Sequence, residues 1–401
     1  MLVRYPSVRR RVLAAFAFLG VPVAANAQDN AWQLVDEFRF DGSSELPLGS
    51  IDQLVPGPDG SVFVAGQGHV AIHVLSRDGQ YERAMGREGD GPGEFRTTPQ
   101  IGLLADTLWA LDRRLRRVSQ FGLSGDLVGG RQLRAVQSNK GFLLNPTALL
   151  ANGTALLMES VGTHWSAEYL SEGAEVRLLS IDDGNSDDIL RLAVSTVWLR
   201  LSLSNETIAA TVQPWSVHDL LAVSPRGDGF VVVSGRGTEN ESGRYTLTWF
   251  DVDGGPTRSA FVPFHGVELA QTVIDSLREG LAEGLAEQMR LDLRSMRRAL
   301  SETLYTPQFL PGVEAVTRSA SGGAAIVAMD GTTWVRHRDV AGTRWLVFDR
   351  SGERIAEVEA PNDLVIHHVG VEHVWGVRED ALGIPLVYRY RLQKERQPGL
   401  R

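Results

Sequence analysis

The stretch from Ile51 to Gly130 decides the fold. It reads IDQLVPGPDGSVFVAGQGHVAIHVLSRDGQYERAMGREGDGPGEF over residues 51–95 and TPQIGLLADTLWALDRRLRRVSQFGLSGDLVGG over residues 98–130. Each part contains short runs rich in β-branched and aromatic residues, separated by turn signals such as Asp59-Gly60 and Asp78-Gly79. Asp-Gly pairs favour the tight turns that join antiparallel strands. The stretch therefore predicts two consecutive copies of one four-stranded antiparallel unit.

The rest of the chain repeats this unit more loosely. Signals before the second strand of a unit occur at Asp59-Gly60, Ala105-Asp106, Asn152-Gly153, Asp228-Gly229, Gly322-Gly323 and Glu372-His373. Signals after the third strand occur at Asp78-Gly79, Ser124-Gly125, Asp183-Gly184, Asp253-Gly254 and Ser351-Gly352. Repeated four-stranded units of this kind indicate a propeller. We predict an all-β fold, a six-bladed β-propeller, in residues 28–401.

The N-terminal part of the chain is predicted to close the ring. The sixth unit has no fourth strand, because the chain ends soon after LVYRYRL at residues 386–392. A suitable strand, WQLVDEFRF, lies at residues 32–40. Pairing it with the last blade covers an edge that would otherwise stay open.

Residues 266–305 interrupt the β pattern and predict a helical insertion. The segment is rich in Ala, Leu, Glu and Arg and contains no Pro. Its apolar residues follow a helical period but change face near Gly280 and Gly284, so we predict two helices that meet there. We expect their apolar faces to pack on the propeller. A lid over the ring and a partner-binding arm are the alternatives.

The first 27 residues have the pattern of a secretory signal peptide. Four Arg precede an apolar run from Val12 to Val23, and Ala25-Asn26-Ala27 provides a cleavage signal. A short membrane anchor is the alternative. Loss of this segment removes four Arg and no acidic residue, so the formal charge falls from −9 to −13. With no Cys in the chain, we predict a periplasmic or secreted bacterial protein without disulfides. So acidic a chain is not expected to bind nucleic acid, and after cleavage we expect no membrane span.

Polar residues at the starts of the first strands are the candidate binding residues. In a propeller these strands surround the central channel, so we expect the residues at its mouth. They are Asp52, Gln100, Asn145, His218, Asp219, Glu314 and Asp363. Such a ring has the oxygen and imidazole ligands that suit Ca²⁺ or Zn²⁺, and a bound metal activates water. Ordinary solvation of strand ends is the alternative, and no catalytic residue is predicted.

Three other features have structural interpretations. Glu88, Asp90 and Glu94 lie in the Gly-rich loop 86–95, but their spacing does not match a calcium loop, and a crossover between blades with Phe95 in the core is preferred. Asp112 is predicted to hold a turn through backbone amides or Arg117. We place His367, His368 and His373 on or near one strand, where the first and last lie about 20 Å apart and cannot share an ion.

The motifs GREGDGPGEF and LWALDRRLRRVSQFGLSG resemble bacterial exported six-bladed β-propellers related to NHL-repeat proteins. The resemblance is strongest over residues 51–130 and implies an envelope location. Similar rings include gluconolactonase-like metal hydrolases. Our hypothesis is a binding or interaction scaffold with a protein or small-molecule ligand, and residues 266–305 are a candidate partner contact. The alternative is a metal-dependent, lactonase-like hydrolase with its site at the channel mouth.

Overall fold

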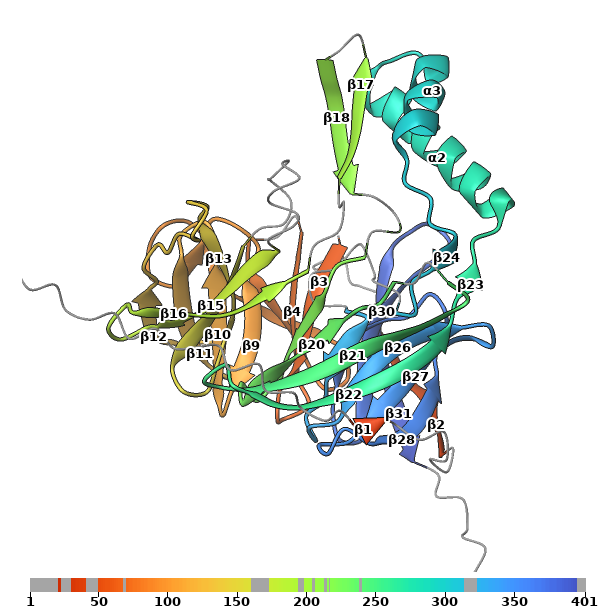
Figure 1. Cartoon of the computed structure of the whole chain (residues 1–401). Helices are drawn as coiled ribbons and strands as arrows, with labels where there is room; N and C mark the ends of the chain where they lie inside the picture. Colours follow the sequence, from red (N-terminus) through yellow and green to blue (C-terminus); the bar gives the residue numbers. More distant parts are fainter. Residues whose placement is uncertain are drawn as a thin grey trace, which may run out of the picture.

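The computed structural model describes residues 21–22, 30–40, 50–67, 70–159, 173–193, 198–203, 206–212, 215, 217–237, 240–313 and 323–394. These residues form six four-stranded antiparallel blades in which the strands follow one another from the centre outward (Figure 1). The predicted six-bladed β-propeller is therefore confirmed. Of the predicted signal peptide only β1 (Val21–Pro22) is described, paired with the outer strand of blade 4, so that prediction stays untested.

Blades 1 to 3 are continuous in sequence. Blade 1 comprises β3 (Ser50–Pro56), β4 (Val62–Gln67), β5 (Ile72–Leu75) and β6 (Tyr81–Met85). Blade 2 comprises β9 (Gln100–Leu104), β10 (Thr107–Asp112), β11 (Arg117–Gly122) and β12 (Leu127–Gln132). Blade 3 comprises β13 (Leu144–Leu149), β14 (Thr154–Glu159), β15 (Ala174–Ser180) and β16 (Ser186–Leu192).

Blades 4 to 6 complete the ring. Blade 4 comprises β19 (Leu220–Val223), β20 (Gly229–Ser234), β21 (Ser242–Asp251) and β22 (Pro256–His265). Blade 5 comprises β25 (Ala325–Val327), β26 (Thr333–Asp339), β27 (Gly342–Phe348) and β28 (Arg354–Glu359). Blade 6 comprises β29 (Val365–Val369), β30 (His373–Glu379), β31 (Pro385–Lys394) and β2 (Ala31–Phe40).

The N-terminal strand closes the ring, as predicted. β2 runs antiparallel to β31, with Trp32 opposite Lys394 and Phe40 opposite Val387. The start of β2 also runs parallel to β28, so blades 5 and 6 share one eight-stranded sheet. The closing strand therefore covers exposed edges of two blades at once.

The sequence-based strand assignment was wrong in blade 5. The signal at Gly322-Gly323 places the apolar run that follows it in the second strand, whereas Ala325–Val327 is the first strand, β25. Its turn lies at Asp330-Gly331, where Gly331 has a φ of 83° and its amide bonds to Ala328. Gly322-Gly323 is therefore not the hairpin turn of this blade. A short apolar run fits either strand position, so the pattern alone could not decide.

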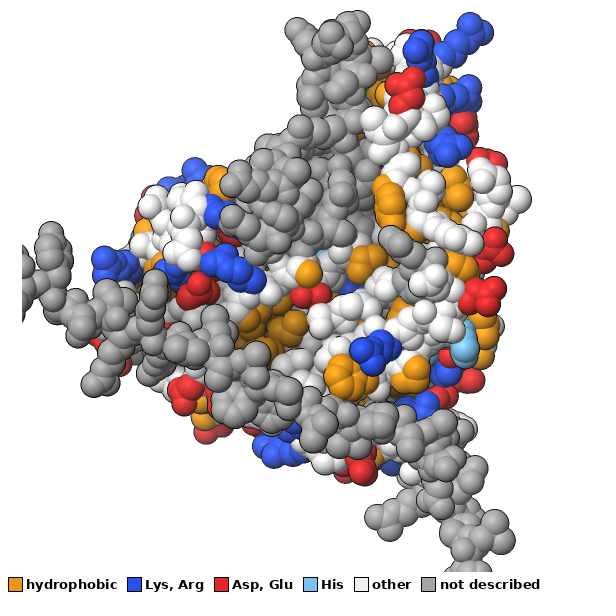
Figure 2. Space-filling view, viewed as in Figure 1, with side chains coloured by type: hydrophobic (Ala, Val, Ile, Leu, Met, Phe, Trp, Pro, Cys, Tyr) orange, Lys and Arg blue, Asp and Glu red, His pale blue; other side chains and the backbone are white. Residues whose placement is uncertain are grey.

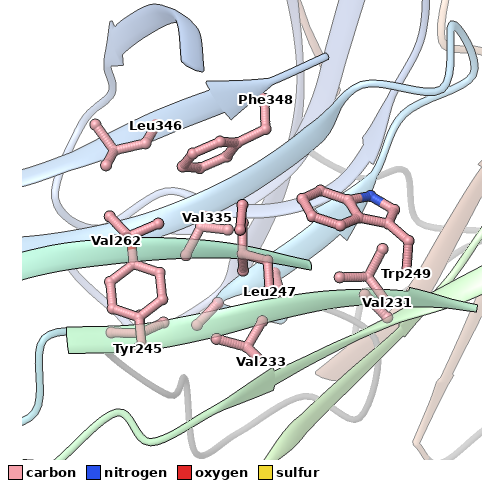
Figure 3. Packing of buried hydrophobic residues seen from close by; sticks show 14 of the residues in the cluster. Val231, Val233, Tyr245, Leu247, Trp249, Val262, Val335, Leu346 and Phe348 are labelled. Atoms are coloured by element: carbon pink, nitrogen blue, oxygen red, sulfur yellow. The ribbon is translucent and has the colours of Figure 1, made fainter. Parts of the chain in front are cut away.

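Each pair of neighbouring blades encloses its own hydrophobic core. Six clusters of buried residues occur, one at each junction around the ring, including the junction of blades 6 and 1. Figure 3 shows the cluster between blades 4 and 5, where Tyr245, Val262 and Leu247 meet Val335 and Phe348. Burial of this apolar surface is the main driving force that holds the blades together. The ring is thus closed by packing as well as by strand pairing.

The insertion forms two helices, but the break is not where the glycines are. α2 (Gln271–Met289) runs straight through Gly280 and Gly284, and a Cβ at either position would meet nothing within 4 Å. α2 ends at Arg290, which adopts a left-handed φ of 55°. α3 (Leu293–Thr303) starts at Asp292, whose side chain accepts a 2.9 Å hydrogen bond from the amide of Ser295.

The helices pack mainly on each other. Their shared core contains buried Ala282, Ala286, Met296, Ala299, Leu300 and Leu304, with Trp215 packed against it. α3 also contacts β17 (Trp198–Leu203), which pairs with β18 (Glu206–Val212). Figure 1 shows the helices and this hairpin side by side, projecting from one end of the ring. The expectation that the apolar faces pack on the blades was therefore wrong, since this core contains no blade residue.

We call α2, α3 and their two connections the arm. At its root β23 (Val267–Glu268) pairs with β24 (Phe309–Leu310). The amide of Gly312 then donates a 2.8 Å hydrogen bond to the carbonyl of Arg236 in blade 4. The amide of Arg338 in blade 5 donates to the carbonyl of Gly312, also at 2.8 Å. The arm is thus tied to two blades where it re-enters the ring.

Candidate functional site

One face of the ring carries the additions to the repeat. Because neighbouring strands of a blade are antiparallel, each inner strand begins at the face where the preceding outer strand ends. We call this the mouth face. The β17–β18 hairpin and the arm both occupy such outer-to-inner connections, on either side of blade 4. Figure 2 shows the surface hollowed between the blades below the arm, with hydrophobic side chains in the hollow.

Asp52 and His367 lie on adjacent inner strands and are both re-aimed by bulges. Asp52 is the extra residue of a β-bulge in β3, and His367 is the extra residue of a bulge in β29. The His367 ring is hydrogen-bonded to the main chain of Asp52. Burial lowers the pKa of His367 to about 4 and raises the pKa of Asp52. Both side chains are partly exposed.

The histidines are not arranged as their spacing predicted. β29 ends at Val369, and His373 begins the next strand, β30, so His367 and His373 do not share a strand. His373 instead pairs with Glu37 of β2 at 3.0 Å. His368 remains beside His367 and burial lowers its pKa to about 4 as well. Both imidazoles are therefore neutral at physiological pH.

In blade 2 the predicted residue Gln100 has a cationic neighbour. Gln100 is the first residue of β9, and its side-chain oxygen accepts a 3.2 Å hydrogen bond from Nε of Arg113. Arg113 follows β10 directly, at the mouth face, and is exposed. Arg113 follows a second strand, so a prediction based on the starts of inner strands does not include it; its signal in the sequence is the DRRLRR turn.

Asn145 provides an unused amide in blade 3. It lies at the second position of β13 and is partly exposed. Its side chain has no hydrogen-bond partner within the part of the chain that the structure describes. Its donor and acceptor groups are consequently open to a ligand.

His218 and Asp219 lie just before β19 in blade 4. The Asp219 carboxylate accepts a 2.8 Å hydrogen bond from the amide of Ala193, and burial raises its pKa. Burial, and then the nearby Arg236, lower the pKa of His218 to about 4. Arg236 is only 1% exposed and donates from Nε to the His218 carbonyl at 2.8 Å. Sequence reasoning missed Arg236, because nothing local shows that this arginine is buried.

The remaining predicted residues lie at blades 5 and 6. Asp363 is exposed just before β29 and pairs with Arg378 of β30 at 2.9 Å. Glu314 lies outside the described residues, and the corrected strand assignment no longer places it at the start of an inner strand. What the other predicted residues have in common is therefore that they lie on the mouth face. They are Asp52, Gln100, Asn145, His218, Asp219 and Asp363.

The Gly-rich loop is the crossover between blades 1 and 2. Phe95 is fully buried in the core that these blades share. The loop's acidic groups are engaged by arginines: Arg96 binds Asp90 and lies 3.8 Å from Glu88, and Arg87 binds Glu94. These ion pairs favour the structural interpretation over a cation site.

Asp112 holds the adjoining turn, as predicted. Its side chain is fully buried and accepts hydrogen bonds from the amides of Thr97 at 3.0 Å and Leu115 at 2.7 Å. A third amide, that of Arg96, also donates to it. The carboxylate therefore fastens the crossover to the turn after β10.

A buried polar chain lies at the root of the arm. Tyr245 is 3.1 Å from Nδ1 of His337, whose Nε2 is 3.2 Å from Asp339. Because the carboxylate only accepts, Nε2 donates to Asp339 and Nδ1 accepts from the Tyr245 hydroxyl. Arg344 holds Asp339 with two hydrogen bonds, of 3.0 and 3.1 Å. Burial raises the pKa of Tyr245, so this chain is a structural element that does not activate the phenol.

The described residues show neither a metal cluster nor a membrane helix. Within them, no group of three or more His, Cys, Asp or Glu side chains is placed to hold a metal ion. Across the same part of the chain, no helix is long and apolar enough to cross a membrane. The mouth face thus offers hydrogen-bonding groups from several blades.

Neither a protein-family model nor a curated protein matches the sequence. Among solved structures, the chain is similar to a Bacteroides fragilis protein predicted to be exported, with 11% identity, 94% of this chain and 100% of that chain covered, and a TM-score of 0.44. A DUF4221 family member from Bacteroides vulgatus has 10% identity, 92% and 100% coverage and a TM-score of 0.45. Regucalcin, a calcium-binding protein of Agrobacterium tumefaciens, has 9% identity, 93% and 99% coverage and a TM-score of 0.42. At these identities the likeness concerns the fold, and calcium binding is a property of regucalcin.

Proposed function

We propose that this chain is a ligand-binding β-propeller of the bacterial cell envelope that recognises its ligand at the mouth face. The observation that carries the proposal is the coincidence of two features on one face. The hairpin and the arm extend the repeat there, and partly exposed polar residues of the inner strands lie on the same face. Concave sites with a few converging polar groups are where proteins usually bind small ligands.

Several of these groups have the state that a binding site needs. Asn145 has an amide without a described partner, and His367 and His368 have neutral rings. A neutral imidazole offers one donor and one acceptor, of which the His367 ring already uses one on the main chain of Asp52. Neutral rings of this kind match a polar ligand without the desolvation cost of a charge. The arm, fixed to blades 4 and 5, extends from the same face.

The envelope location rests on the signal-peptide pattern of residues 1–27. The alternative is a metal-dependent hydrolase, and among the described residues no group of three or more His, Asp or Glu side chains is placed to hold a metal ion. We propose binding and assign no reaction.

The test is a thermal-shift screen of the purified full chain against envelope metabolites, sugars and short peptides. A compound that binds the native state raises the melting temperature in a concentration-dependent manner. We expect Asn145→Ala to weaken the effect of a hit. Asn152→Ala is the matched control, since Asn152 lies in the β13–β14 turn on the opposite face. Equal loss in both variants, or hits affected by neither, would contradict binding at the mouth.

A further inference from the structure

Arg113 has an unusual set of partners for a cation at the mouth face. Its hydrogen bond to Gln100 is its only side-chain interaction with the part of the chain that the structure describes. That bond uses Nε and a neutral amide oxygen. The two terminal nitrogens of the guanidinium are left without a described acidic partner. These nitrogens form the fork that binds carboxylates and phosphates in a bidentate manner.

Blade 6 contains the same arrangement with the charge neutralised. Arg378 is near the end of the second strand and reaches the start of the inner strand, as Arg113 does in blade 2. There the partner is the carboxylate of Asp363, at 2.9 Å. The ion pair raises the pKa of Arg378, whereas Arg113 has no acidic partner of this kind among the described residues. At the start of the inner strand, blade 6 therefore has an acidic partner for its arginine, whereas blade 2 has the neutral Gln100.

The neighbouring groups do not neutralise Arg113 either. Arg116 donates to the carbonyls of Leu144 and Arg134, both at 2.9 Å. Arg117 donates to main-chain carbonyls of the crossover loop. Asp112, the acid in this turn, already accepts three amide hydrogen bonds. The DRRLRR turn is thus a local concentration of positive charge in an acidic protein.

We propose that Arg113 and Gln100 form the anchor for a small anionic ligand, with a carboxylate or phosphate group bound to the free guanidinium nitrogens at the mouth. This inference rests on the proposed function, because it names the ligand class and an anchor for the same face. Gln100 holds Nε and so orients the fork, and its own amide nitrogen is available as a further donor. A bound anion supplies the charge that Asp363 supplies in blade 6.

The experiment measures the melting temperature of the full chain against inorganic phosphate, against succinate and against potassium chloride, at matched ionic strength and pH. Phosphate and succinate separate the two sources of the anionic group. We expect a saturable rise with at least one of them beyond the chloride baseline. Arg113→Gln should abolish this rise. Arg114→Gln removes the same charge from the next residue, which is exposed and has no described side-chain hydrogen bond, and should retain it.

Arg113→Lys is a second variant in case Arg113→Gln fails to fold. It keeps the positive charge but loses the planar guanidinium that binds an anion through two nitrogens. It should raise the dissociation constant about tenfold or more if recognition is bidentate. The proposal is overturned if neither anion exceeds chloride, or if Arg113→Gln keeps the full rise. A neutral hit that depends on Asn145 and ignores Arg113 would overturn the anionic class and leave mouth binding intact. Absence of any hit at the mouth would instead refute the proposed function.

Discussion

Nη1 of Arg236 donates a 2.8 Å hydrogen bond to the carbonyl of Val313, where the arm re-enters the ring. The same guanidinium donates from Nε to the carbonyl of His218 at the mouth. One buried cation thus joins the root of the arm to the approach of the inner strand of blade 4. The arm is for this reason a fixed wall of the mouth, held in place at its base.

Loss of this cation should loosen the root of the arm. In Arg236→Met the carbonyls of His218 and Val313 lose their donors, so we expect the free energy of unfolding to fall by about 2–4 kcal/mol. Hydrogen exchange should accelerate at residues 309–313 and less in the outer strands. Arg258→Met, which removes a cation stacked 4.4 Å from the Trp249 ring centre, is the control. Unchanged exchange at residues 309–313 would contradict the role given to Arg236.

The closing strand should be a main determinant of stability. Trp32 is 9% exposed and lies in the core between blades 5 and 6. Trp32→Ala removes this burial and should cost about 3–5 kcal/mol, measured by urea denaturation. Leu127→Ala, at an exposed position of the outer strand β12, should change stability by less than about 0.5 kcal/mol. Similar effects of the two changes would show that β2 does not close the ring.

Stability should fall in acid because of the enclosed histidines. The pKa values of His218, His367 and His368 are about 4 in the folded protein, below the ordinary value near 6.5. The unfolded chain therefore binds protons first, so this contribution is complete above about pH 6.5 and is lost as the pH falls toward 4. Denaturation at pH 7.5 and 4.5 measures the loss.

Replacing these rings should flatten the pH profile. His367→Gln removes one titrating group, so its stability should depend less on pH than that of the unmodified chain. His265→Gln, an exposed position, is the control. An unchanged slope in His367→Gln would mean that the ring is charged or solvated in the folded state.

The polar chain below the arm gives a fourth prediction. Tyr245→Phe removes the hydroxyl that donates to His337 and leaves a buried nitrogen without its partner. We expect a loss of about 1–3 kcal/mol, because an unsatisfied buried acceptor keeps its full desolvation cost. Urea denaturation provides the measurement. A Tyr245→Phe variant as stable as the parent would show that water replaces the hydroxyl.

The repeat was predictable because its turns are local. Asp59-Gly60 and Asp78-Gly79 predict the hairpins. Because the sixth unit has no fourth strand of its own, the strand at residues 32–40 could be predicted to complete it. The helix break was not predictable in the same way. Gly280 and Gly284 lie within α2 on a side with open space. α2 ends instead at Arg290, whose left-handed conformation cannot be predicted from its residue type.

The site was only partly predictable. Residues at strand starts could be located from the repeat, and Gln100 and Asn145 lie where expected, on inner strands at the mouth face. Charge pairing depends on tertiary contacts, so the difference between Arg113 and Arg378 became visible only in the structure. The bulges that re-aim Asp52 and His367 likewise arise from strand register, which composition does not specify.

The absence of cysteine from the chain permits a direct test of recognition at the mouth. A single cysteine at Gln100→Cys, labelled with a bulky maleimide, obstructs the mouth. The same label at Asp106→Cys lies in the exposed β9–β10 turn of the same blade, on the opposite face. Binding of the strongest hit from the thermal-shift screen is then measured by calorimetry on both labelled proteins. We predict that the label at position 100 abolishes binding and the label at position 106 leaves it unchanged. Undiminished binding with the mouth labelled would contradict the account.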